Sequence, residues 1–402
     1  MRAIPDSVLG LLERSRPEIG LAVLSLCLTV ASQVLAQDAA SFDSGPAIGD
    51  PYGRKGLTLG SYAIYPDAAL IVSADDKGRL TPSLKSMLHI LKRSGRHSVE
   101  GAFSIKGDFA DDRLRPGDMS VNAELGIDRK LAPGVSLELD TSYMFDRDAL
   151  LFPHDAEDRE QRVDAYAGIE WRTPYADIKF DTGAALTHID ELRSAGDFDA
   201  TYVEPDAALR LTAKTGTTLR PFVEAAYVPR RYVRDSSRDY DGYELILGLD
   251  AGTSGPVSGE AGIILVSQHY ADPQARTQHA IGLNIDMTWR VKDSTQVVLA
   301  AATIIDQGVG GQVEGVPVHT IRLEMNHALA DGLRFDLSLE AEIENGRGHD
   351  DWLALTPALA LTWQFNPTAA WVSNVEIEWE KRRGSKTGTL GATLATGLQL
   401  RL

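Results

Sequence analysis

Polar and apolar residues alternate along one segment after another of this chain. In residues 334–344, RFDLSLEAEIE, every second residue is polar and the residues between are apolar. Strict alternation places one set on each face of an extended strand. The same pattern recurs in four further segments: residues 121–128, 164–172, 283–290 and 374–380. The sequence therefore predicts a series of amphipathic strands, although residues 295–305 are mostly apolar and fit this pattern poorly.

Short turn signals divide the chain at intervals of about 36 to 42 residues, a repeat typical of supersecondary units. These signals are RSGR near Ser94 and residues 132–134, 172–174, 214–217, 253–256, 292–294, 330–332 and 366–368. A second polar break, usually longer, falls inside each interval, for example DQGVGGQVEG after Ile305. Eight turns and nine loops then separate about 18 strands between Gly60 and Leu402 (16 to 18 within the error of such a reading), and both termini fall on the turn side.

Two all-β architectures produce such alternation. A soluble β-sandwich covers its apolar faces with a second sheet, and its strands average nearer six residues. A transmembrane barrel turns its apolar face to lipid, and closure removes the unpaired strand edges. The long strands, the regular charge on one face and the lack of a convincing helix favour an antiparallel up-and-down transmembrane β-barrel.

The first residues predict export. Arg2, Arg14 and Arg16 precede the apolar run IGLAVLSLCLTVAS, and Val34 and Ala36 suit a cleavage site before Gln37. We therefore expect a signal peptide over residues 1–36, a flexible periplasmic segment over residues 37–56 and the barrel over residues 57–402. An uncleaved anchor is the alternative. The single cysteine lies inside this leader, and the net charge of −17 argues against nucleic acid as a partner.

Several stretches resemble a known family. GLTLGSYAIYPDAAL (residues 56–70), PFVEAAYVPRRY (residues 221–232), SQHYADP (residues 267–273) and the closing TGLQLRL are similar to segments of the putative beta-barrel porin 2 family of Gram-negative outer-membrane proteins. The resemblance implies location in the outer membrane, with membrane lipid and the barrel-assembly machinery as partners. It also suggests an association with exopolysaccharide-export components. Such chains usually end in an aromatic residue, whereas this one ends in Leu402.

Barrels of this size can hold a water-filled channel, and the alternation predicts its lining. Carboxylates outnumber cations among the predicted lining residues, so we expect a mild preference for cations. The candidates are Glu124, Glu138, Asp140, Asp164, Glu170, Lys179, Arg210, Arg220, Asp286, Arg290, Arg322, Glu324, Arg334, Asp336, Glu340, Glu342, Glu344, Glu376, Glu378 and Glu380. In the alternative, these groups pair across strands inside an occluded barrel that conducts nothing.

No sequence signal points to an enzyme, a cofactor or a metal. The histidines lack metal-ligand spacing, and no serine has nucleophile-elbow surroundings. A barrel hydrolase whose catalytic groups meet only in three dimensions remains the weakest of the three functional readings. We expect the longest loop, residues 146–161, to be a solvated external loop. The alternative is that its apolar centre ALLF folds inward as a constriction or plug.

Overall fold

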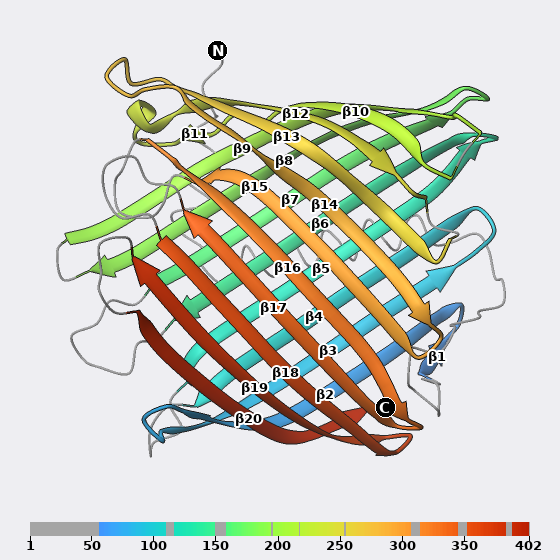
Figure 1. Ribbon diagram of the computed structural model, residues 1–402, viewed down its shortest axis with the longest axis vertical. Helices are drawn as coiled ribbons and strands as arrows, with labels where there is room; N and C mark the ends of the chain where they lie inside the picture. Colours follow the sequence, from blue (N-terminus) through green and yellow to red (C-terminus); the bar gives the residue numbers. More distant parts are fainter. Residues whose placement is uncertain are drawn as a thin grey trace.

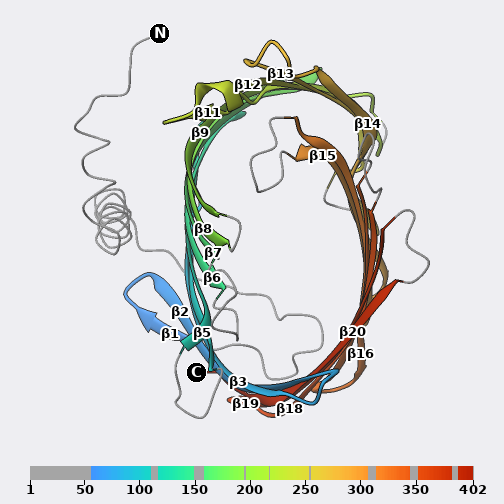
Figure 2. The same cartoon turned by 90° about the vertical axis from the view of Figure 1, so that its left-hand side faces the viewer.

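A computed structural model describes residues 56–109, 116–148, 158–193, 196–216, 218–252, 255–306, 314–344, 352–382 and 388–401. The predicted signal peptide and nearly all of the predicted N-terminal segment lie outside these residues. The described chain forms one antiparallel sheet that closes on itself (Figures 1 and 2). Among the described residues, no helix is long and apolar enough to cross a membrane.

The strands follow one another around the sheet in chain order. The first half comprises β1 (Leu57–Leu59), β2 (Tyr62–Asp75), β3 (Leu80–Arg93), β4 (His97–Phe109), β5 (Pro116–Ala132), β6 (Val135–Asp148), β7 (Asp158–Arg172), β8 (Ala176–Arg193), β9 (Gly196–Ala213), β10 (Arg220–Tyr227) and β11 (Arg231–Tyr232). The second half comprises β12 (Tyr240–Asp250), β13 (Val257–Tyr270), β14 (Gln278–Lys292), β15 (Thr295–Asp306), β16 (Val316–Ala330), β17 (Leu333–Glu344), β18 (Trp352–Asn366), β19 (Ala369–Arg382) and β20 (Thr389–Arg401). A short 3-10 helix, η1 (Ser236–Arg238), precedes β12.

The barrel has 18 strands, as predicted from the sequence. β10 and β11 both pair with β9, so together they form one interrupted strand. β1 pairs only with the first residues of β2 and stands apart from the ring. β2 pairs with β20 from Asp67–Arg401 to Asp75–Thr393, and this ladder closes the barrel. Closure satisfies the backbone hydrogen bonds that an open sheet edge would leave unpaired in lipid.

Tight turns and longer connections alternate as predicted. Two-residue turns join β5 to β6 and β16 to β17, where Gly134 and Gly332 each adopt a φ of 76°. Glycine takes this left-handed conformation without the steric cost that a side chain would impose. A Cβ at Gly332 would also lie 2.5 Å from the carbonyl oxygen of Gln364. Both features require glycine at this turn.

The outward face of the sheet is apolar. Large hydrophobic side chains remain exposed on it along nearly every strand, for example Leu247, Ile263, Leu283, Leu359 and Leu398. A soluble protein would bury such a surface, whereas acyl chains cover it in a bilayer.

Exposed aromatic residues mark the two edges of the apolar band. At the turn end they are Trp171, Tyr175, Trp289, Trp363, Phe365 and Trp371. At the loop end, an aromatic row of Tyr227, Tyr243, His269 and His279 crosses β10, β12, β13 and β14, with ring centroids 5.3, 5.8 and 6.3 Å apart in succession. Amphipathic rings at these levels are typical of membrane interfaces.

The last strand keeps the predicted outward alternation. Leu398 and Leu400 are exposed on the apolar face of β20. Leu402, which stands where an aromatic residue is usual, lies outside the described residues.

Leu359 and Thr356 lie on opposite faces of β18 and provide a test of the lipid-facing assignment. Leu359→Arg places a guanidinium group in hydrocarbon and is expected to lower the free energy of unfolding by about 2 to 4 kcal/mol. Thr356→Arg, opposite Glu340 on the inner face, is expected to cost nothing measurable. Urea titration in lipid vesicles, followed by tryptophan fluorescence, measures both. An equal loss for the two variants would contradict the assignment.

Candidate functional site

The inner face of the sheet carries the predicted lining residues. Cross-strand pairing links them in continuous rows, for example Glu138 to Gly168, Glu170 to Lys179 and Lys179 to Arg210. On the other side of the ring, Arg322 pairs with Glu340 in the same register. Side chains that are directly opposite in a ladder lie on the same face. All twenty predicted residues therefore share the face opposite to the exposed leucines, while their role in lining a conducting channel stays a prediction.

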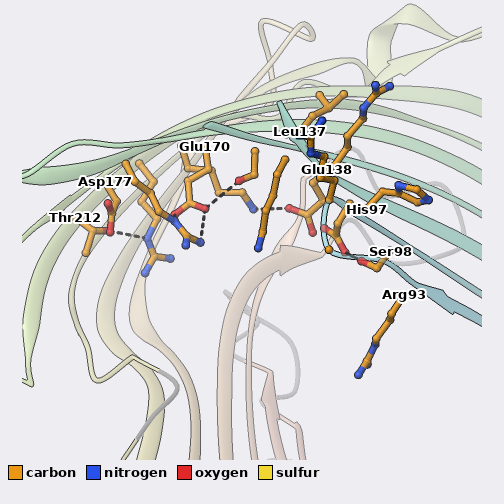
Figure 3. A pocket seen from close by; sticks show the side chains of 18 of the residues that line it. Arg93, His97, Ser98, Leu137, Glu138, Glu170, Asp177 and Thr212 are labelled. Atoms are coloured by element: carbon orange, nitrogen blue, oxygen red, sulfur yellow. Dashed lines mark hydrogen bonds and ion pairs between the residues drawn. The ribbon is translucent and has the colours of Figure 1, made fainter. Parts of the chain in front are cut away.

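A polar cavity of about 850 Å³ occupies the turn-side half of this face, against β4 to β12 (Figure 3). Nine arginines and lysines line it, against five carboxylates. Arg129 borders the cavity from the outward phase of Leu137 and Ile169. The basic side chains of the inner face are Arg93, Arg96, Lys130, Arg172, Lys179, Arg210, Lys214 and Arg220. This part of the inner face, which we call the basic wall, is locally cationic, although carboxylates dominate the predicted lining as a whole.

Ion pairs tie the strands of the basic wall together. Lys179 Nζ lies 3.1 Å from Glu138 Oε2 two strands away. Asp177 accepts from Lys214 at 2.8 Å and from Arg220 at 3.3 Å. In Figure 3, the carboxylates of Glu138, Glu170 and Asp177 project from successive strands, with basic side chains between them. The structure thus brings Glu138, Glu170, Lys179 and Arg220 together at one cavity.

Arg210 is the most enclosed of these cations. Its guanidinium lies 2.5 Å from Glu260 Oε2 and 3.5 Å from Glu224 Oε2, and it stacks 3.8 Å from the ring centroid of Phe222. One side chain therefore connects β9, β10 and β13 through charge and through the face of an aromatic ring.

The opposite side of the barrel is acidic. Glu340, Glu342 and Glu344 on β17 and Glu376, Glu378 and Glu380 on β19 flank β18, which presents Ala354, Thr356 and Ala358 between them. Within the described residues, these six carboxylates form no ion pair. We call this surface the acidic wall. β7 and β17 are nine strands apart in a ring of eighteen, so the two walls lie on opposite sides of the interior, the basic wall toward the turns and the acidic wall toward the loops.

The remaining predicted residues divide into two groups. Asp164, Glu324 and Asp336 pair with arginines on their own strands: Arg162 (2.9 Å), Arg322 and Arg334 (2.7 Å), respectively. The other group forms no ion pair among the described residues: Glu124, Asp140, Asp286 and Arg290. Five further charged residues on this face are absent from the predicted lining: Asp177, Lys214, Glu224, Asp250 and Glu260. All five fall in the same alternating phase, which is the signal that could have identified them.

One strand departs from the cylinder. The ladder between β14 and β15 ends at Ile285–Ala301, although β15 continues to pair with β16 as far as Asp306–Val316. Beyond this point β15 passes to the inner side of β14 (Figure 2). There Ile305 joins an inward-facing apolar cluster with Phe222, Ile246, Ile264, Val266 and Ala280.

Polar contacts fix this inner segment. The side-chain amide of Gln268 donates to the Ile305 carbonyl at 2.9 Å, and the Gly315 amide donates to Tyr270 Oη at 2.7 Å. Glu314 accepts from the Arg276 amide at 2.9 Å and from Gln278 Nε2 at 3.1 Å. We call residues 302–306 and 314–319 the inner arm, since together they lie against the inside of the wall.

The poor fit of residues 295–305 to the barrel pattern lies in the inward series of β15, which is apolar from Val298 to Ile304. The inner arm buries Thr303 and Ile305 of the outward series instead, while Ile304 stays 51% exposed, so burial does not account for the poor fit. The loop predicted over residues 146–161 was placed too broadly. Its ends, residues 146–148 and 158–161, belong to β6 and β7, and its apolar centre lies outside the described residues.

Comparison with known proteins identifies one family. The sequence pattern described as "Putative beta-barrel porin 2" matches residues 172–388, more than half of the chain. The match includes the segments at residues 221–232 and 267–273, but neither the opening nor the closing segment that also resembled the family. No curated protein matches the sequence.

Solved outer-membrane proteins are similar in structure. The alcaligin outer membrane receptor FauA from Bordetella pertussis has 8% identity and a TM-score of 0.40, over 87% of this chain and 77% of its own. The siderophore receptor PirA from Pseudomonas aeruginosa has 8% identity and a TM-score of 0.43, over 84% and 80%. CdiB from Acinetobacter baumannii has 8% identity and a TM-score of 0.45, over 85% and 60%.

Arg210 offers a test of the basic wall. Arg210→Leu leaves Glu224 and Glu260 without their cation and is expected to lower the free energy of unfolding by about 1 to 2 kcal/mol, less than for a dry ion pair because the interior is wet. Arg322→Leu removes an exposed pair with Glu324 and should cost less than about 1 kcal/mol. Urea unfolding midpoints in vesicles compare the two. If Arg322→Leu proved the more damaging, the role assigned to Arg210 would be wrong.

Proposed function

Because the chain belongs to the putative beta-barrel porin 2 family of outer-membrane barrels, we propose that it is a non-enzymatic aqueous channel for small hydrophilic solutes. The observation that carries this proposal is the polar cavity of about 850 Å³ inside the barrel, lined by charged side chains from many strands. Diffusion of small solutes needs a water-filled path of this kind. It does not need a catalytic group. Ion pairs along one wall hold long side chains to that wall, which supports an open interior over an occluded one.

The charge distribution supports a mild preference for cations. The acidic wall holds six carboxylates that the described residues leave unpaired, whereas five cations of the basic wall are engaged by Glu138, Glu170, Asp177, Glu224 and Asp250. Carboxylates that lack a bound partner attract mobile cations to the path. The acidic wall lies toward the loop-side end of β17 and β19, so a cation entering from that side would meet it first.

An association with polysaccharide export is a second use of such a barrel. The basic wall at the turn-side mouth favours it, because Arg93, Arg96 and Lys130 form no ion pair among the described residues and could receive an anionic chain. The acidic wall on the opposite side disfavours passage of a strongly anionic polymer. Small solutes therefore remain the cargo that the geometry supports best.

Reversal potentials in planar bilayers under a potassium chloride gradient test the channel and its selectivity together. The unmodified protein is expected to show discrete conductance steps and a reversal potential of the sign that cation preference gives. Glu342→Gln with Glu378→Gln removes two charges from the acidic wall and should move the reversal potential toward zero. The matched control, Glu342→Asp with Glu378→Asp, keeps both charges and should leave the reversal potential in place.

Two results would count against the proposal. The absence of any conductance step from folded, inserted protein would favour the occluded barrel. Anion preference in the unmodified protein would refute the assigned role of the acidic wall.

A further inference from the structure

The inner arm occupies a position that competes with ordinary strand pairing. Extending the register of Ile285–Ala301 along the wall would place Leu283 opposite Thr303 and Ile281 opposite Ile305. Instead, the β14–β15 ladder stops, and Leu283 N–H donates to the Thr303 hydroxyl at 3.2 Å. An antiparallel strand directs the N–H groups of alternate residues to the same edge. The N–H groups of His279 and Ile281 therefore point to the same side as that of Leu283, where β15 offers them no ladder partner.

The strands overlap where the β14–β15 ladder is missing. β15 contacts β13, and β14 contacts β16, although each pair is separated by one strand in the sheet. Second-neighbour strands in a regular sheet lie about 9.6 Å apart, too far for such approach. The wall is therefore two strands thick here, because the outer side of the inner arm lies against the inner side of β14.

Gly282 makes the overlap possible. A Cβ built on Gly282 would lie 1.9 Å from Thr303 Oγ1 and 2.6 Å from Thr303 Cβ. No side chain could occupy this position while β15 crosses behind β14. In the regular ladder, residue 282 would face the interior. Small side chains fit on that face, as Ala354, Thr356 and Ala358 of β18 show.

The composition of β15 suits both positions. Its outward series, Leu299, Ala301, Thr303 and Ile305, contains no charge. Its inward series is uncharged from Val298 to Ile304 and ends in Asp306, which faces the interior in either position. In the overlapped position Ile305 is 6% exposed within the apolar cluster. In the regular ladder the same side chain would face acyl chains, which also accept isoleucine. A charged residue in the outward series would have favoured one position only.

From these observations we infer that the inner arm is a gate with two positions. In the overlapped position it narrows the loop-side half of the interior, and in the regular ladder it joins the wall and widens the path. Burial of Ile305 and the hydrogen bonds of Gln268, Tyr270 and Thr303 stabilise the first position. Completion of the β14–β15 ladder stabilises the second. The inference rests on the proposed channel function, because a gate has meaning only for a path that conducts.

Paired cysteines distinguish the two positions in the full chain carrying Cys27→Ser. Ala280 and Ile305 share the apolar cluster, so Ala280→Cys with Ile305→Cys should form a disulfide in the overlapped position. Ile281 is 69% exposed on the outer face, so Ile281→Cys with Ile305→Cys should link only when the arm joins the wall. We expect the first pair to oxidise readily, and its oxidation in a planar bilayer to abolish the larger conductance level until a reductant restores it.

Gly282→Val should hold the arm in the wall. Disulfide formation is then expected to shift from the first pair to the second, and the channel should stay at its larger conductance level. Gly391→Val is the matched control, since a Cβ there meets nothing within 4 Å, and it should behave as the unmodified protein does.

The outcomes separate the gate from the channel. Failure of the first pair to link, or the same conductance in its oxidised and reduced forms, would overturn the gate. Linkage that Gly282→Val leaves unchanged would also overturn it. If no variant conducts while Gly282→Val still shifts the linkage, the channel proposal fails and the two positions of the arm stand.

Discussion

Backbone hydrogen bonding in a solvent that supplies none is the constraint on which this structure depends. Each strand in hydrocarbon must satisfy its N–H and C=O groups through a neighbour, since an unpaired group costs several kcal/mol there. The ladder between β2 and β20 meets this demand by removing the two free edges. Closure also separates two environments, so one face of every strand can be apolar and the other charged. The exposed leucines and the inner rows of charge follow from the same closure.

The charged interior is divided into a basic wall and an acidic wall. Between the strands of the basic wall, arginines and lysines hold carboxylates on neighbouring strands, and Arg210 joins three strands at once. The acidic wall lacks such pairs among the described residues and presents small side chains between its two rows of glutamate. Charged residues of the basic wall thus hold neighbouring strands together, while the carboxylates of the acidic wall remain available to mobile ions. The chain has no disulfide to share the first task within its described part.

Most of the fold could be predicted from the sequence because a barrel repeats one simple rule. Alternation along residues 334–344 fixed which side chains share a face, and turn residues such as Gly332 fixed where the strands reverse. The same alternation identified the lining, including Glu138 and Lys179, but not which groups pair, because pairing depends on register between strands far apart in sequence. The departure of β15 from the cylinder was beyond such reasoning. It brings Thr303 close against Gly282, and no alternation of polar and apolar residues encodes that contact.

The ladder that closes the ring joins the first long strand to the last. Asp67 and Arg401 are direct partners although nearly the whole barrel lies between them in the chain. Contacts of such sequence separation form late, because the entropy of bringing distant segments together precedes any reward from pairing. Until β20 has been delivered, β2 and the growing end both expose unpaired edges that can join other chains. We therefore expect that the free edges of β2 and of the growing end are kept from other chains during assembly. Pairing of β2 with β20 is then the last step.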